Sequence, residues 1–315
     1  MDISIVIPLY NEAESLPELM EWINRVLEKR KFEVVFVDDG SKDDSWSVIE
    51  ELQTNYPGKV KGIKFARNYG KSAGIQKGFE VSIGTVVFTM DADLQDSPDE
   101  ILVMEKLLLD GGFDLISGWK KERHDPLSKT IPTKLYNWMT RRVSGIYLND
   151  FNCGLKCYKH DVVKAIEVQG EMHRYIPLLA KAAGFDKIGE HVVSHKARKY
   201  GTTKFGLERF TNGMLDLMTI AFVQRFGRKP MHLFGLLGLL TFAVSTGLFI
   251  AIAGYKLYAM NIGVQAKNIT EISAFYVALT GMILGSQLFL AGFISEMVSR
   301  NSPQRTEYRI SEKIN

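Results

Sequence analysis

Two long runs without a charged side chain stand out in the pattern of apolar and polar positions. Residues 231–255 and residues 272–295 contain no Asp, Glu, Lys or Arg. A helix needs about 20 apolar residues to cross the core of a bilayer, so each run is long enough to do so. The alternative is a pair of buried helices in a soluble core, but core helices of this length usually carry a charged edge. The pattern therefore predicts a two-helix membrane hairpin over residues 231–300.

Basic residues are denser on the outer flanks of the two runs than in the loop between them. The loop holds Lys256 and Lys267. The outer flanks hold Arg225, Arg228, Lys229, Arg300, Arg305 and Arg309. The positive-inside rule places both flanks in the cytoplasm, and the N-terminal sequence has no basic region or cleavage site of a signal peptide. We therefore expect a multi-pass protein of the cytoplasmic (inner) membrane, with its N-terminal domain and both termini in the cytosol.

The region before the hairpin alternates short apolar runs with helical stretches. Runs rich in β-branched and aromatic residues predict strands over residues 3–7, 33–37, 60–65, 85–90 and 113–117. Helical stretches are expected between them, over residues 12–29, 43–55, 71–81 and 98–110. Near-continuous apolar strands that alternate with helices predict an α/β fold with a mostly parallel sheet covered on both faces.

A further helical pattern precedes the first uncharged run. Its apolar residues include Phe210, Met214, Leu217 and Met218. This spacing predicts an amphipathic helix that lies on the membrane surface or packs against the cytosolic domain, and both alternatives stay open. The expected organisation of the chain is a cytosolic domain, the juxtamembrane helix, the hairpin and a cytosolic tail, over residues 1–204, 205–230, 231–300 and 301–315.

Polar clusters follow the first four predicted strands, at the edge where parallel sheets bind ligands. They read PLYNE over residues 8–12, DDGS over 38–41, ARNYG over 66–70 and DADLQ over 91–95. One such loop could be a turn with a helix cap, and Ser41 and Ser97 are predicted as caps. Four loops that converge on one edge instead predict a ligand site.

The D-x-D pair in the fourth cluster has a specific chemistry. Asp91 and Asp93, with Gln95, offer the hard oxygen ligands that Mg²⁺ or Mn²⁺ prefers, and such an ion would neutralise a departing diphosphate.

The common nucleotide motifs are absent. No G-x-G-x-x-G follows the first strand, and Phe65 stands where a P-loop ending in Gly70-Lys71-Ser72 would need glycine.

Composition excludes several classes of protein. Of the 315 residues, 46% are apolar and the net charge is +3. This apolar content and low charge exclude an intrinsically disordered chain, and the low charge also argues against a nucleic-acid partner. Two cysteines exclude a disulfide scaffold. The spacings Cys153-x₃-Cys157 and His191-x₃-His195 resemble zinc ligands, but both segments are strand-like, which favours positions in a core.

Four motifs, in this order and spacing, resemble those of the inverting family 2 glycosyltransferases. They read VIPLYNEAESL, VDDGSKDDS, RNYGKSAGIQKGF and MDADLQDSPDEI. The likeness extends to the two C-terminal spans and is strongest to polyisoprenyl-phosphate glycosyltransferases, namely dolichol-phosphate mannose synthase-like enzymes and bactoprenol glucosyltransferases of the GtrB type. It implies a metal-dependent hexosyltransferase whose catalytic domain has the Rossmann-like GT-A fold.

The resemblance also implies roles for single residues. The residues implied to bind the nucleotide sugar are Pro8, Tyr10, Glu12, Asp39, Gly70, Lys71, Asp91 and Ala92. A Mg²⁺ or Mn²⁺ ion is expected on Asp91, Asp93 and Gln95. Asp93 is implied to be catalytic, as is Asp150, which would orient the sugar or the acceptor or is otherwise an ordinary loop acid.

The acceptor side rests on a basic segment that reads R-x-x-G-x-T-K. Arg198 and Lys204 can clamp a phosphate, and Thr203 adds a hydroxyl donor. Arg123 and Lys129 fall where similar enzymes place further phosphate-binding residues, although each of these cations could be an ordinary surface charge. The implied reaction is attack by an undecaprenyl or dolichyl phosphate on the sugar of UDP-glucose, with inversion at the anomeric carbon.

Other donors and other functions stay open. GDP-mannose or another UDP-sugar would serve in the same reaction. A processive polysaccharide synthase would carry more spans and a Q-x-x-R-W motif, which Gln224-Arg225-Phe226 does not match. A non-catalytic membrane scaffold that binds nucleotide would not need the intact D-x-D pair.

The expected partners follow from the same reaction. They are a nucleotide sugar, a polyisoprenyl phosphate and the membrane, and a flippase or a second glycosyltransferase would use the product downstream. Close packing between chains through Gly238, Gly247, Gly281 and Gly285 would give a homo-oligomer.

Overall fold

The computed structural model describes residues 1–121, 137–142, 144–195, 222, 226, 229–265 and 267–300. The chain forms two compact units, Met1–Met218 and Thr219–Asn315, and each is described by itself. Five predicted acceptor residues lie outside the described residues, namely Arg123, Lys129, Arg198, Thr203 and Lys204. So do the tail over residues 301–315 and the predicted juxtamembrane helix, except at residues 222, 226, 229 and 230. The domain boundaries expected from the sequence stay predictions.

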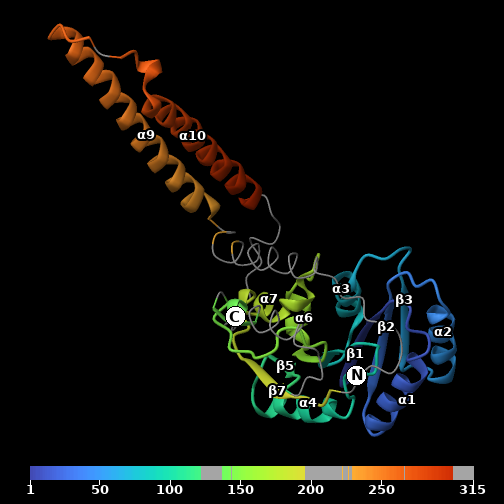
Figure 1. The fold of residues 1–315 in the computed structure, drawn as a ribbon. Helices are drawn as coiled ribbons and strands as arrows, with labels where there is room; N and C mark the ends of the chain where they lie inside the picture. The colour runs from blue at the N-terminus through green and yellow to red at the C-terminus, as the bar shows by residue number, and fades with distance from the viewer. Residues whose placement is uncertain are drawn as a thin grey trace, which may run out of the picture. The chain divides into compact units, whose positions relative to one another are not determined.

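The first unit is built on a seven-stranded sheet with the order β3-β2-β1-β4-β6-β5-β7 (Figure 1). The strands are β1 Ile3–Leu9, β2 Phe32–Asp38, β3 Val60–Lys64, β4 Val86–Thr89, β5 Leu115–Trp119, β6 Lys156–Lys159 and β7 Ile188–Val192. β6 is antiparallel to β4 and β5, and the other pairs are parallel. The predicted mostly parallel sheet is confirmed, and β6 and β7 fall in the two strand-like segments that carry the Cys and His spacings.

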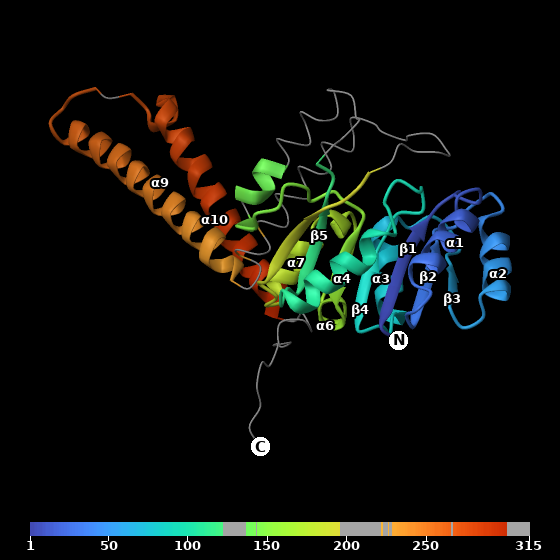
Figure 2. The ribbon, with the colours of Figure 1, turned by 90° about the horizontal axis from the view of Figure 1, so that it is seen from below.

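Helices cover both faces of the sheet, as predicted (Figure 2). They are α1 Leu16–Val26, α2 Ser45–Asn55, α3 Lys71–Val81, α4 Glu100–Asp110, α6 His160–Ala165 and α7 Ile176–Ala182, with the short 3₁₀ helix η1 Met172–Arg174. Ile5 of β1 lies in a core cluster with residues of α1, α2 and α4, whereas Val6 packs with α3, α6 and α7. This alternation follows from the two-residue period of a strand, and each buried aliphatic side chain contributes about 1.5–3 kcal/mol.

The second unit is a pair of long apolar helices. α9 spans Pro230–Asn261 and α10 spans Ser273–Arg300, with the 3₁₀ helix η2 Ile269–Glu271 before α10. Both are long and apolar enough to cross a membrane, and Figure 1 shows them side by side. A Cβ added at Gly238 would lie 2.6 Å from the backbone nitrogen of Phe289, and one at Gly281 would lie 2.0 Å from Ser245 Oγ. These glycines therefore let the two helices of one chain approach closely.

Candidate active site

The loops that follow β1 and β2 are joined by hydrogen bonds. Asn11, which has a left-handed φ of 56°, donates its N–H to Ser41 Oγ at 2.9 Å, and its Oδ1 accepts from the Lys42 N–H at 2.8 Å. The next N–H, of Glu12, donates to Ser45 Oγ at 3.0 Å. The carboxyl ends of the two neighbouring strands thus form one continuous polar surface.

The prediction that Ser41 and Ser97 cap helices is wrong. α2 begins after Asp44 and α4 after Asp99, and neither N-terminus has a side-chain cap. The hydroxyl of Ser41 serves the loop after β1 instead, and Ser97 Oγ donates to Asp99 Oδ2 at 3.1 Å. Both serine hydroxyls therefore form hydrogen bonds within the site loops, although local sequence rules would assign them to helix N-termini.

Asp39 joins the loop after β2 to the start of α3. Its Oδ1 accepts the Tyr69 N–H at 2.6 Å and its Oδ2 accepts the Gly70 N–H at 2.9 Å. Gly40, with a φ of +72°, permits the approach, because a Cβ there would lie 2.6 Å from the carbonyl carbon of Arg67. The structure therefore brings together Asp39 and Gly70, two residues predicted to bind the nucleotide sugar.

Lys71 and Asp91 form an ion pair across the end of the sheet. Lys71 is the first residue of α3, Asp91 follows β4, and their side chains are 32% and 31% exposed. Burial acts to raise the pKa of Asp91, but the charges of Lys71 and Lys120 outweigh it and hold that pKa well below its usual range. Asp91 is therefore a carboxylate at neutral pH, as a metal ligand must be.

Two further lysines surround this carboxylate. Lys120, directly after β5, pairs with Asp96 at 2.7 Å, and the Asp96 side chain is fully buried. Burial acts to lower the pKa of Lys120, but the neighbouring charge of Asp96 outweighs burial and raises that pKa above its usual value, so Lys120 is protonated at neutral pH. Lys156 of β6 is buried and donates to the carbonyl of Cys153, and its burial lowers its pKa. None of these three residues was predicted for the site. The sequence offers one signal for them, since Asp96 directly follows the DADLQ loop and Lys120 lies three residues after the strand predicted over residues 113–117.

The D-x-D loop itself fits a metal that is shared with a substrate. Asp93 is 8% exposed and its Oδ1 accepts the Gln95 N–H at 3.2 Å. Gly154 gives the Asp91 carboxylate its space, since a Cβ at this position would lie 2.6 Å from Asp91 Oδ2. No group of three or more His, Cys, Asp or Glu that could hold a metal occurs among the described residues. One or two carboxylates with substrate phosphates are the usual Mg²⁺ site of nucleotide enzymes.

Asp150 lies at the same end of the sheet. It is 1% exposed, its N–H donates to Glu190 Oε1 at 3.0 Å, and its Oδ1 accepts the Asn152 N–H at 3.0 Å. Its charge acts on the pKa values of Cys153 and Lys156, which places it beside the cluster around Asp91. Asp150 is therefore a fixed, buried acid and not an exposed loop residue.

The remaining predicted residues contribute differently. Pro8 contacts α3, because a Cβ at Gly74 would lie 3.0 Å from Pro8 Cβ. Tyr10 and Glu12 are partly exposed on the loop after β1. Ala92 packs in the core cluster, so it offers the site its backbone rather than its side chain.

The two cysteines take the core positions that the sequence favours. Both are buried and free. Burial raises the pKa of Cys153 to about 12 and that of Cys157 well above its usual value. Neither thiol is therefore prepared to bind zinc.

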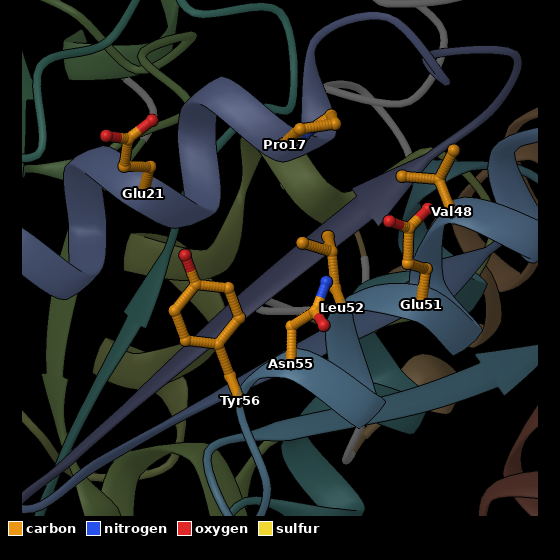
Figure 3. A pocket seen from close by; sticks show the side chains of 7 residues that line it. All are labelled: Pro17, Glu21, Val48, Glu51, Leu52, Asn55 and Tyr56. Carbon is orange, nitrogen blue, oxygen red and sulfur yellow. The ribbon is translucent and has the colours of Figure 1, made fainter.

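A cavity of about 410 Å³ lies elsewhere, between α1 and α2 (Figure 3). Its lining consists of Pro17, Glu21, Val48, Glu51, Leu52, Asn55 and Tyr56. Two carboxylates and no Lys or Arg line it, so its charge would repel a diphosphate. The strand-end loops are the better candidate for binding such a group.

Comparison with known proteins identifies the family of the chain. The family model described as glycosyl transferase family 2 matches residues 4–165, which include the loops after β1 to β4. The dodecaprenyl-phosphate galacturonate synthase of Rhizobium johnstonii is 31% identical over 95% of this chain and 88% of its own length. The undecaprenyl-phosphate 4-deoxy-4-formamido-L-arabinose transferase of Pseudomonas syringae is 36% identical over 75% of this chain and 68% of its own.

The fold also occurs among solved structures. Glucosyl-3-phosphoglycerate synthase from Mycobacterium tuberculosis, in complex with Mn²⁺, UDP-glucose and phosphoglyceric acid, superposes with a TM-score of 0.52. The match covers 71% of this chain and 79% of that chain at 16% identity, which shows a common GT-A-type fold.

Proposed function

The chain belongs to glycosyl transferase family 2, and we propose that it transfers a sugar from a nucleoside-diphosphate sugar to a polyisoprenyl phosphate. One observation carries the proposal, namely that Asp39, Lys71 and Asp91 meet at the carboxyl end of the sheet in a chain that also has two long apolar helices. The names of the relatives support the acceptor, since both join a sugar to a polyprenyl phosphate.

On the donor side, the joined loops after β1 to β4 bind the nucleotide sugar. Asp39 holds the turn at Tyr69 and Gly70, and Lys71 supplies a cation for the diphosphate. Asp91, Asp93 and Gln95 would hold Mg²⁺ or Mn²⁺, which when bound neutralises the charge of the departing nucleoside diphosphate. Lys71 would then interact with both the Asp91 carboxylate and the diphosphate.

On the acceptor side, the phosphate of the lipid is already anionic at neutral pH and needs no strong general base. Its oxygen forms a bond to the anomeric carbon, the bond from that carbon to the diphosphate breaks, and the configuration inverts. Arg198, Thr203 and Lys204, with Arg123 and Lys129, bind the acceptor phosphate. Asp150 orients the sugar or the acceptor from its buried position.

The membrane part keeps the enzyme at its substrate. A polyisoprenyl tail stays in the bilayer, so the catalytic domain over residues 1–204 must work at the membrane surface. α9 and α10 span the inner membrane, and the catalytic domain and both termini lie in the cytosol, in keeping with the basic flanks of the hairpin. The amphipathic segment predicted over residues 205–230 and the tail predicted over residues 301–315 complete the proposed organisation.

A panel of donors tests the proposal. Full-length protein in vesicles with undecaprenyl phosphate is given UDP-glucose, GDP-mannose, and nucleotide sugars that carry galacturonate or 4-deoxy-4-formamido-L-arabinose. The last two sugars are included because the relatives are named for them. We expect one donor to give a lipid-linked sugar with Mg²⁺ or Mn²⁺ and none with chelator. Asp110→Asn, on the exposed end of α4, is the matched control for Asp93→Asn.

Two results would overturn the proposal. A lipid-free polymer would identify a polysaccharide synthase, and binding of nucleotide without turnover of any donor would identify a scaffold.

A further inference from the structure

Three contacts attach residues 191–195 to the segment that follows the D-x-D loop. Glu100, the first residue of α4, accepts the Ser194 N–H on Oε1 at 3.2 Å. Its Oε2 lies 3.2 Å from His191 Nε2. An isolated backbone bridge joins Asp96 to His195. Residues about 100 positions apart in the chain are therefore held together at the end of β7.

The segment that receives these contacts is itself fixed. The buried Asp96 carboxylate pairs with Lys120 at the end of β5, and β5 is the parallel neighbour of β7. Asp96 directly follows the proposed metal ligands, and His195 stands three residues before Arg198. Glu100 therefore ties the segment that follows the donor-binding loop to residues 191–195, which precede the basic acceptor segment in the chain.

We infer that Glu100 is a positioning residue for the acceptor, which sets the point from which the basic segment begins. The inference rests on the proposed function, because it takes the acceptor to be the phosphate that Arg198 and Lys204 bind. The donor residues do not depend on Glu100, since Asp39 is held by the amides of Tyr69 and Gly70 and Asp91 is paired with Lys71. Loss of the Glu100 carboxylate should thus weaken use of the acceptor and leave use of the donor unchanged.

The test compares two substitutions of Glu100 in the full-length protein, assayed with undecaprenyl phosphate and the donor that supports transfer. Glu100→Ala removes both contacts, and we expect the KM for undecaprenyl phosphate to rise about fivefold to tenfold. Glu100→Gln keeps an oxygen that accepts the Ser194 N–H, and its amide donates to His191 Nε2 once the neutral imidazole moves its proton to Nδ1, so this variant should stay within about twofold of the wild type. The donor KM should not change in either variant.

Two further variants test whether the effect of Glu100→Ala is specific to its contacts or reflects a general loss of structure. His191→Ala removes one of the two side-chain contacts, and the acceptor KM should rise by less than in Glu100→Ala. Asp110→Ala, exposed at the other end of α4, should change neither KM. An equal rise of both KM values in Glu100→Ala, or no rise of the acceptor KM, would overturn the inference.

Amide hydrogen exchange separates this inference from the proposed function. The Ser194 amide should exchange faster in Glu100→Ala than in the wild type, whether or not the protein turns over a lipid. Unchanged exchange would overturn the anchoring role of Glu100. A wild-type protein that makes no lipid-linked sugar would overturn the proposed function instead.

Discussion

The ammonium group of Lys71 pairs with the carboxylate of Asp91, so the first residue of α3 meets the end of β4. The pair joins a residue proposed to bind a diphosphate to a residue proposed to bind a metal. Without substrate, the lysine pairs with the carboxylate that the proposed metal ion would bind. The first prediction follows from this competition.

Lys71→Met should have opposite effects on metal and donor. Mn²⁺ should bind about twofold to fivefold more tightly in the absence of nucleotide, because an ion pair that is about one-third exposed is worth about 0.5–1 kcal/mol. The KM for the donor should rise because a cation near the diphosphate is lost. Mn²⁺ titration followed by electron paramagnetic resonance measures the first effect. Lys77→Met, on the exposed side of the same helix, is the control. Weaker Mn²⁺ binding in Lys71→Met would argue against the competition.

Gly154→Ala should impair the site without unfolding the domain. The added Cβ would lie 2.6 Å from Asp91 Oδ2, so the carboxylate must move away from its position. We expect Mn²⁺ affinity and kcat to fall about tenfold or more, since small displacements of reacting groups are costly. A melting curve and a metal titration on the same preparation separate the two effects. Normal Mn²⁺ binding in the variant would show that Asp91 is not a metal ligand.

The two cysteines should resist alkylation in the native protein. Because burial raises the pKa of Cys153 to about 12, only about one thiol in 10⁴ is ionised at pH 8. Iodoacetamide should therefore modify neither Cys153 nor Cys157 until the protein is unfolded. Mass spectrometry before and after denaturant counts the modified thiols. Rapid native labelling of either residue would contradict the buried positions in the core.

The close contact between α9 and α10 predicts unequal effects of alanine in the hairpin. At Gly238 a Cβ would meet the backbone of Phe289 at 2.6 Å, so Gly238→Ala should destabilise the hairpin by about 1–3 kcal/mol. At Gly247 no described atom lies within 4 Å of the added Cβ, and Gly247→Ala should have little effect. Thermal melts in detergent of the two variants compare them directly. Equal losses of stability would indicate that Gly247 also packs, as it would in a homo-oligomer.

Much of the fold could be predicted because its signals are local. The helix expected over residues 71–81 is α3, and the apolar runs correspond to β1 to β5. The four strand-end loops were found for the same reason, since each follows a strand. α1 begins later than expected, at Leu16, with Pro17 in its first turn.

The rest could not be predicted because it depends on long-range pairing. β6 lies between β4 and β5 and runs antiparallel to both, which brings Lys156 close to Asp91. Alternation of apolar and polar residues does not specify this order. The contact of Glu100 with His191 likewise needs β7 beside β5, which no local pattern predicts.

The composition of the product tests the central claim most directly. Full-length wild-type protein and Asp93→Asn are incubated with undecaprenyl phosphate, Mn²⁺ and the accepted nucleotide sugar, and the lipids are analysed by mass spectrometry. We predict that the wild type forms a lipid with one added sugar and a single phosphorus atom, and that Asp93→Asn forms at least about a hundredfold less. A product with two phosphorus atoms, or undiminished product from Asp93→Asn, would contradict direct sugar transfer to the lipid phosphate at this site.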